Sequence, residues 1–159
     1  MAAEARIQDL GISLSQNTSP LGNFNYIPTR RSGNLVFVSG QLPRVERDGV
    51  VELIEGKVGD TIDLESAQVA AKLCGISILS VLRDSIGSLD KVKAVLKVEG
   101  FVNAVNSFTD HPLVINGCSD LLVHVFGREI GSHARVAVVC SSLPKGVPVE
   151  VSAIFEISD

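Results

Sequence analysis

Tryptophan is absent from the sequence, and tyrosine and methionine occur once each. Aromatic residues make up 4 % of the chain, which is too few for the stacking platforms that bind single-stranded nucleic acids. Basic residues are also outnumbered by acidic ones, 14 against 18, so the net charge is −4. A protein that binds phosphate backbones usually presents a basic face. We therefore expect no nucleic-acid partner.

Cysteine is scarce as well, with three residues at positions 74, 118 and 140. This odd number with wide spacing fits neither a disulfide framework nor a zinc site, and it favours a reducing compartment. The three histidines are equally scattered along the sequence. Helix-end or surface roles therefore explain them better than a metal site, and we expect no bound metal.

Long apolar runs are missing, and no segment approaches the length of a membrane span. The N-terminal residues include Glu4 and Asp9 and contain no continuous apolar stretch. This pattern argues against a secretory signal and against a transit peptide. We expect a cytoplasmic protein without a membrane partner.

The hydrophobic content is substantial, because 45 % of the 159 residues are apolar and the mean hydropathy is +0.31. A chain of this length buries roughly two thirds of its unfolded surface as one domain. We therefore expect a single domain over residues 1–159, in which residues 1–20 form an N-terminal extension. The positive hydropathy also indicates surface that is buried against another subunit.

The local patterns predict two long helices among several strands. Asp63 is a good N-cap for a helix from Leu64 to about Ser85, and Asp110 and Pro112 can open a second helix that Gly127 ends. A short helix is expected over residues 2–10. Strands are expected at residues 35–38, in a hairpin with the segment around Tyr26, at 50–54 and at 92–98, with a charged loop at 44–49.

The C-terminal residues 132–157 contain two β-branched stretches separated by a Leu-Pro-Lys-Gly turn. If these strands pair as an antiparallel hairpin, Arg135 lies opposite Glu150. A cross-strand ion pair that only stabilises a sheet is one explanation of the two charges. The element order predicts an α+β sandwich, with a mixed or antiparallel sheet and both helices on one face.

Several landmarks then carry a family resemblance: Gly33–Pro43, Val114–Gly117, Ala134–Arg135, and Leu143–Pro144 followed by Val149–Val151. Over about residues 22–157 the chain resembles the RidA/YjgF reactive-intermediate deaminases, whose older name is L-PSP endoribonuclease. The N-terminal helix places it nearer to a longer branch of that family.

The resemblance implies a chorismate mutase-like fold, with a six-stranded mixed sheet backed by two helices. It also implies a homotrimer whose sheets form a central barrel, with ligand clefts between adjacent subunits. The implied activity is hydrolysis of 2-imino acids, or their enamine tautomers, to 2-keto acids and ammonia. No metal or organic cofactor is implied.

Arg135 matches the arginine that holds the substrate carboxylate in the family, and its planar fork suits that task. Glu150 matches the carboxylate that handles a water or a proton. Further matches to ligand-site positions are Tyr26, Ser39, the backbone N–H of Gly40, and Asn116. Structural roles are the alternative: an interface aromatic for the tyrosine, and partners for buried backbone groups for the serine and asparagine.

Two positions depart from the best-known deaminases. Ala137 stands where cysteine is common, and Val136 replaces a small polar residue. Both differences bear on pocket shape and substrate choice.

Two competing functions therefore stand beside imine hydrolysis. One is a non-enzymatic binder of small carboxylate metabolites that uses the same cleft, and the other is an endoribonuclease, which the acidic charge disfavours.

Overall fold

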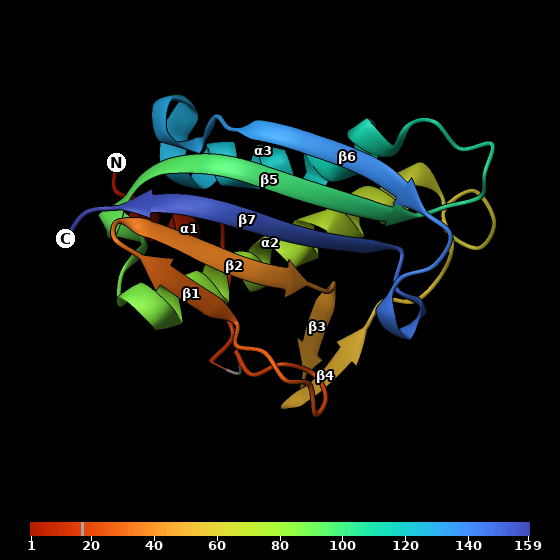
Figure 1. The fold of residues 1–159 in the computed structure, drawn as a ribbon, viewed down its shortest axis with the longest axis horizontal. Coiled ribbons are helices and arrows are strands. Elements are labelled where there is room, and N and C mark those ends of the chain that lie inside the picture. The colour runs from red at the N-terminus through yellow and green to blue at the C-terminus, as the bar shows by residue number, and fades with distance from the viewer. Residues whose placement is uncertain (17) are drawn as a thin grey trace.

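The computed structural model describes residues 1–16 and 18–159. A five-stranded sheet has the order β1-β2-β7-β5-β6, and the strands β3 and β4 form a separate two-stranded hairpin. Figure 1 shows the helices together behind the large sheet, and the β3–β4 hairpin beyond the end of β2. The elements are α1 (Ala3–Asp9), β1 (Thr29–Ser32), β2 (Leu35–Gln41), β3 (Arg44–Arg47), β4 (Val50–Leu53), α2 (Leu64–Ile86), η1 (Leu89–Lys91), β5 (Val92–Asn103), α3 (His111–Gly131), β6 (Ala134–Cys140), η2 (Pro144–Gly146) and β7 (Val149–Ile157).

The two-layer α+β architecture and the mixed sheet agree with the prediction, but two details of it are wrong. The large sheet has five strands rather than six, because β3 and β4 pair only with each other. The short helix predicted over residues 2–10 is confirmed as α1, which joins the two long helices and contacts α3. Residues 44–47, expected in a loop, are strand β3.

Helix α2 begins where the sequence predicts. The Asp63 carboxylate accepts a hydrogen bond from the Ser66 N–H at 2.8 Å, which satisfies one of the free donors at the helix start. Helix α3 also begins where the sequence predicts, with Asp110 at the N-cap position and Pro112 in the first turn. The Asp110 side chain makes no capping bond, however, and its backbone carbonyl accepts from the Leu113 N–H. Gly127 has φ 80° and interrupts α3, so the regular helix ends near the predicted position.

Helices α2 and α3 lie close together because a glycine faces the contact. A Cβ atom at Gly117 of α3 would overlap the backbone carbonyl of Gln68 in α2. The side chains beneath this crossing are fully buried, among them Ile78, Leu82, Ile115 and Leu122. The absence of a Cβ atom at Gly117 thus lets the two amphipathic helices pack closely and cover one face of the sheet.

The C-terminal strands do not form the predicted hairpin. Strand β5 lies between them, pairing in parallel with β6 and antiparallel with β7. The short connection therefore crosses over β5 instead of joining neighbouring strands. Arg135 pairs with Val98 and Glu150 pairs with Phe101, so the two charged residues are not opposite each other.

The sheet face opposite the helices carries exposed apolar side chains. Phe37, Val136 and Val138 are 42 %, 42 % and 39 % exposed, whereas Val36 and Val38 on the helix side are buried. Within this chain, strand β2 is therefore covered on its helix-facing side and open on the other. Neighbouring apolar positions on an open sheet face are typical of a surface that another protein covers.

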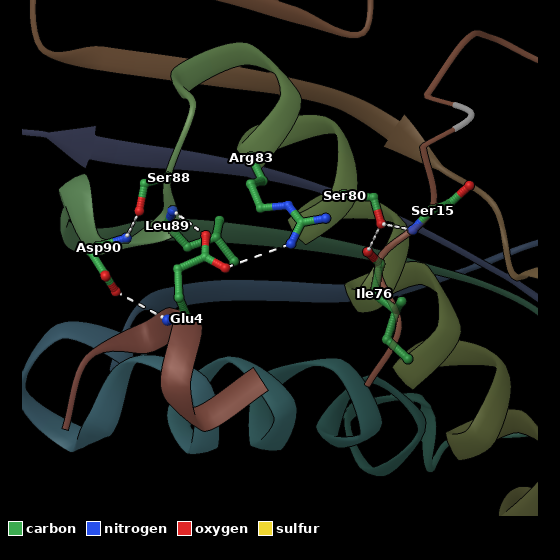
Figure 2. Close-up of polar contacts among 8 residues, drawn as sticks. All are labelled: Glu4, Ser15, Ile76, Ser80, Arg83, Ser88, Leu89 and Asp90. Atoms are coloured by element: carbon green, nitrogen blue, oxygen red, sulfur yellow. Dashed lines mark hydrogen bonds and ion pairs between the residues drawn. The ribbon is translucent and has the colours of Figure 1, made fainter. Parts of the chain in front are cut away.

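Glu4 fixes the N-terminal helix to the rest of the fold, as Figure 2 shows. Its carboxylate accepts the Leu89 N–H at 2.9 Å and lies 3.6 Å from the Arg83 guanidinium. In return, the Glu4 N–H donates to the Asp90 carboxylate at 3.0 Å. The side chains of α1 and η1 thus accept hydrogen bonds from each other's N–H groups, which fixes α1 beside the end of α2 and the start of β5.

We expect Glu4→Ala to lower the free energy of unfolding by about 1–3 kcal/mol, because it leaves a partly buried N–H without an acceptor. Glu4→Gln keeps an amide acceptor for Leu89 and is expected to lose less. Urea denaturation with an unchanged m value measures the difference. Glu129→Ala, at an exposed position of α3, is the control, and an equal effect at both positions would contradict the capping role of Glu4.

Candidate functional site

The site residues predicted from the sequence form two groups. Arg135 and Asn116 lie together at the edge strand β6, beside α3. Tyr26, Ser39, Gly40 and Glu150 belong to the region of β2 and β7, on the other side of β5. Different neighbouring residues hold each group in place.

The Arg135 guanidinium is held by the first three turns of α3. Its Nη1 donates to Asn116 Oδ1 at 2.7 Å and to Ser119 Oγ at 3.1 Å, and its Nη2 donates to the Pro112 carbonyl at 3.3 Å. Asn116 and Ser119 are three residues apart and therefore project from the same side of the helix. The arginine is positioned from a helix rather than a loop.

An arginine has five N–H donors, of which three are used by these contacts. Within the part of the chain that the structure describes, the Nε–H and one Nη2–H of Arg135 have no protein partner. The Nε–H and the adjacent Nη2–H of an arginine share one edge of the guanidinium plane, and that edge can bind a carboxylate through two parallel hydrogen bonds. The side chain is therefore both fixed and able to bind an anion.

Sequence reasoning missed two residues of this group, Ser119 and His133. His133 Nε2 lies 2.9 Å from Ser119 Oγ, and its Nδ1 lies 2.6 Å from the Gly131 carbonyl oxygen. Burial lowers the pKa of His133, and the nearby Arg135 charge adds to that shift. The signal in the sequence was the spacing of Ser119 from Asn116 along one helix.

The second group gathers where β2 is irregular. The register of β2 against β7 shifts between Val38 and Gln41, which places Ser39 and Gly40 in a bulge. Ser39 Oγ donates to the Ile27 carbonyl at 2.7 Å and holds the preceding segment along β2. Tyr26, next to Ile27, is 47 % exposed and stacks on Phe24 with ring centroids 6.4 Å apart.

Glu150 lies directly over the bulge. A Cβ atom at position 40 would collide with the Glu150 carboxylate, so a larger residue there would displace this carboxylate from its position over the bulge. Burial raises the pKa of Glu150 above its usual range. A carboxyl group in this state retains its proton more readily than an exposed one, which suits a group that both accepts and returns a proton.

The raised pKa predicts how stability depends on pH. The unfolded chain loses this proton at lower pH than the folded chain does, so ionisation of Glu150 favours unfolding as pH rises through the folded-state pKa. We expect Glu150→Gln to stabilise the protein slightly at neutral pH, by less than about 1 kcal/mol because the group is partly solvated. Thermal denaturation at several pH values should show this gain disappear toward pH 4. A gain that persists in acid would contradict the assignment.

The two groups lie on opposite faces of the sheet. Glu150 is in register with Phe101 and Val138, and position 138 is three residues from Arg135 in the same strand. Side chains three residues apart in a strand point to opposite faces. The predicted cross-strand ion pair is therefore wrong, and one chain does not bring Arg135 and Glu150 to a common ligand.

No three His, Cys, Asp or Glu side chains in residues 1–16 and 18–159 are grouped so that they could hold a metal ion. Among the same residues, no helix is both long and apolar enough to span a membrane.

Comparison with known proteins gives consistent matches along the chain. The family model described as "YjgF/chorismate mutase-like, putative endoribonuclease" matches residues 4–154. Protein TCP17 of Trypanosoma cruzi is 40 % identical, over 98 % of this chain and 94 % of its own. Protein Atu1372 of Agrobacterium tumefaciens is 42 % identical with a TM-score of 0.86, covering 99 % of this chain and 94 % of its own. A Shewanella oneidensis protein with the same endoribonuclease description is 28 % identical with a TM-score of 0.89, covering 99 % and 100 %.

Proposed function

Because the chain belongs to the RidA/YjgF family, with its chorismate mutase-like fold, we propose that it hydrolyses reactive 2-imino acids or enamines. The products are 2-keto acids and ammonia, and the reaction takes place in a cleft between two copies of the chain. The observation that carries the proposal is Arg135, which α3 holds through three hydrogen bonds while two parallel donors remain free. Such an edge recognises the carboxylate that all 2-imino acids share.

The reaction needs a fixed substrate, an activated water and a proton for the leaving nitrogen. Arg135 binds the carboxylate and thereby places the adjacent C=N carbon. The imine reacts in its protonated form, and ionised Glu150 accepts a proton as water attacks that carbon, which gives a neutral carbinolamine. The same carboxyl returns this proton to the nitrogen. As the C–N bond breaks, the Glu150 carboxylate accepts the hydroxyl proton of the carbinolamine, which leaves the ketone, and that proton then passes to the released ammonia to give ammonium. Burial raises the pKa of Glu150, so its carboxylate is a stronger base than an exposed one.

A second copy of the chain supplies the missing half of the site. Arg135 and Glu150 lie on opposite faces of one sheet and two strands apart, a lateral distance of roughly 10 Å. The exposed Phe37, Val136 and Val138 give the open face the apolar character of a subunit contact. A homotrimer with a central barrel of sheets covers this face and brings Arg135 of one subunit toward Glu150 of its neighbour.

Within the cleft, Tyr26 supplies an exposed ring beside the bulge, and the backbone N–H of Gly40 together with Ser39 lines the end of β2. Asn116 acts through Arg135, since its side-chain oxygen accepts an Nη1 hydrogen bond. Ala137 leaves the strand beside Arg135 without the thiol of the best-known deaminases. The proposed chemistry requires no thiol, metal or organic cofactor.

The direct test is the release of ammonia and keto acid from a freshly generated 2-imino acid, compared with spontaneous hydrolysis in the same buffer. A wild-type chain that accelerates release supports the enzymatic proposal. If the rate equals the spontaneous rate, imine hydrolysis is excluded for that substrate. Keto-acid binding by calorimetry without turnover would then favour the runner-up, a non-enzymatic binder of small carboxylates.

An endoribonuclease is a weaker proposal that rests on the description of the family model and of the Shewanella protein. The net charge of −4 and the scarcity of aromatic residues oppose RNA binding. RNA cleavage that copurifies with the chain and disappears in a site variant would support this activity.

The proposed location is the cytoplasm. Cys74, Cys118 and Cys140 are free thiols, which suits a reducing compartment.

A further inference from the structure

Behind Arg135, three side chains from two elements form a hydrogen-bond chain that ends on the backbone. Arg135 Nη1 donates to Ser119 Oγ at 3.1 Å, Ser119 Oγ lies 2.9 Å from His133 Nε2, and His133 Nδ1 lies 2.6 Å from the Gly131 carbonyl oxygen. Ser119 belongs to α3, and His133 lies in the connection between α3 and β6. These hydrogen bonds thus link Arg135 to the α3–β6 connection, which comes directly before the strand that carries Arg135.

Only one arrangement of protons lets every group donate and accept in turn. A carbonyl oxygen can only accept, so His133 carries its proton on Nδ1. A guanidinium can only donate, so Ser119 Oγ accepts from Arg135. The Ser119 hydroxyl then donates to the unprotonated Nε2 of a neutral imidazole. Burial lowers the pKa of His133, which favours the neutral imidazole of this assignment.

Ser119 is 8 % exposed, so water has little access to replace its hydroxyl. Together with Asn116, Ser119 takes both hydrogens of Arg135 Nη1. Fixing these two bonds sets the rotation of the guanidinium plane and therefore the direction of its Nε–H and Nη2–H edge. A serine without an acceptor for its own proton is free to rotate, and its lone pair is no longer held toward Arg135.

We propose that Ser119 and neutral His133 are positioning residues that orient Arg135 for a carboxylate. This inference rests on the proposed role of Arg135 as the carboxylate clamp and extends it to side chains that do not touch the ligand. According to this proposal, the hydrogen bonds that join Arg135, Ser119 and His133 make the site prefer a carboxylate over an uncharged ester.

Two measurements test the proposal separately from turnover. Nitrogen-15 NMR of the wild-type imidazoles is expected to show His133 protonated on Nδ1 and unprotonated on Nε2. Calorimetry with pyruvate and with methyl pyruvate then measures the preference for acid over ester. Ser119→Ala and His133→Phe are expected to weaken pyruvate binding about tenfold, the effect of losing one hydrogen bond to a charged group, and to change ester binding little.

His133→Gln is the conservative variant, since its amide can accept from Ser119 and donate to the Gly131 carbonyl, and we expect it to recover most of the pyruvate affinity. His124→Phe, at an exposed position of α3, is the matched control. A His133 protonated on Nε2, or an unchanged acid preference in folded Ser119→Ala and His133→Phe, would overturn the proposal. Pyruvate binding without imine turnover removes the enzymatic function and leaves this inference intact, whereas a wild type that binds no pyruvate overturns both.

Discussion

Arg135→Ala is expected to reduce kcat/KM for 2-imino acid hydrolysis at least about 100-fold, to a rate near the spontaneous one. The variant removes the two free donors that the substrate carboxylate needs, together with the positive charge that α3 holds in place through Asn116 and Ser119. Ammonia and keto-acid release measure the effect. Pyruvate affinity by calorimetry is expected to fall in parallel.

Two further variants show whether activity depends on the planar guanidinium with its paired donors or only on a positive charge. Arg135→Lys keeps the charge but has no planar pair of donors, so we expect it to recover little activity. Arg47→Ala removes an exposed arginine of β3 and is expected to match the wild type. Full activity in a folded Arg135→Ala protein would remove the carboxylate clamp from the mechanism.

Mixed oligomers of two inactive variants are expected to be active. If each site takes Arg135 from one subunit and Glu150 from its neighbour, a random mixture of Arg135→Ala and Glu150→Gln chains contains both intact residues in about one site in four. Activity is expected to rise from near zero in each variant to about a quarter of the wild-type value after co-refolding.

The control mixture combines Arg135→Ala with the double variant, in which every site lacks the arginine, and it is expected to stay inactive. Native mass spectrometry confirms that mixed oligomers have formed. Mixed oligomers of the two single variants without activity would place Arg135 and Glu150 in one chain's site, against the geometry of the sheet. Both residues must therefore be tested in the assembled protein.

Local signals predicted the helices well. Asp63 and the apolar periodicity that follows it predicted a helix from Leu64 to about Ser85, and α2 spans Leu64–Ile86. A cap and a helical stripe are set by residues a few positions apart, so a sequence window contains the needed information. Asp110 was the exception, since the helix start there is satisfied by backbone groups instead.

The pairing of the last two strands could not be predicted in the same way. A short turn between β-branched stretches favours a hairpin, but strand neighbours are chosen by packing across the whole sheet. Inserting β5 between β6 and β7 buries Val98 and Val102 under the helices. The wrong strand pairing also gave a wrong arrangement of the site, because Arg135 and Glu150 are not cross-strand partners within one chain.

The family resemblance predicted a set of candidate site residues but not their arrangement in space. Asn116 was named from the helix that offers it, and its hydrogen bond to Arg135 agrees with that position. Ser119 and His133 were not singled out, because their connection depends on where β6 begins relative to α3. Such contacts follow from tertiary packing, which one sequence does not reveal.

A crystal structure of the assembled protein with a bound 2-keto acid tests the central claim most directly. The account predicts that the keto-acid carboxylate accepts hydrogen bonds from the Nε–H and Nη2–H of Arg135 in one subunit, with Glu150 of a neighbouring subunit beside the ketone carbon. A keto acid bound away from Arg135, or contacted by Arg135 and Glu150 of the same chain, would contradict it.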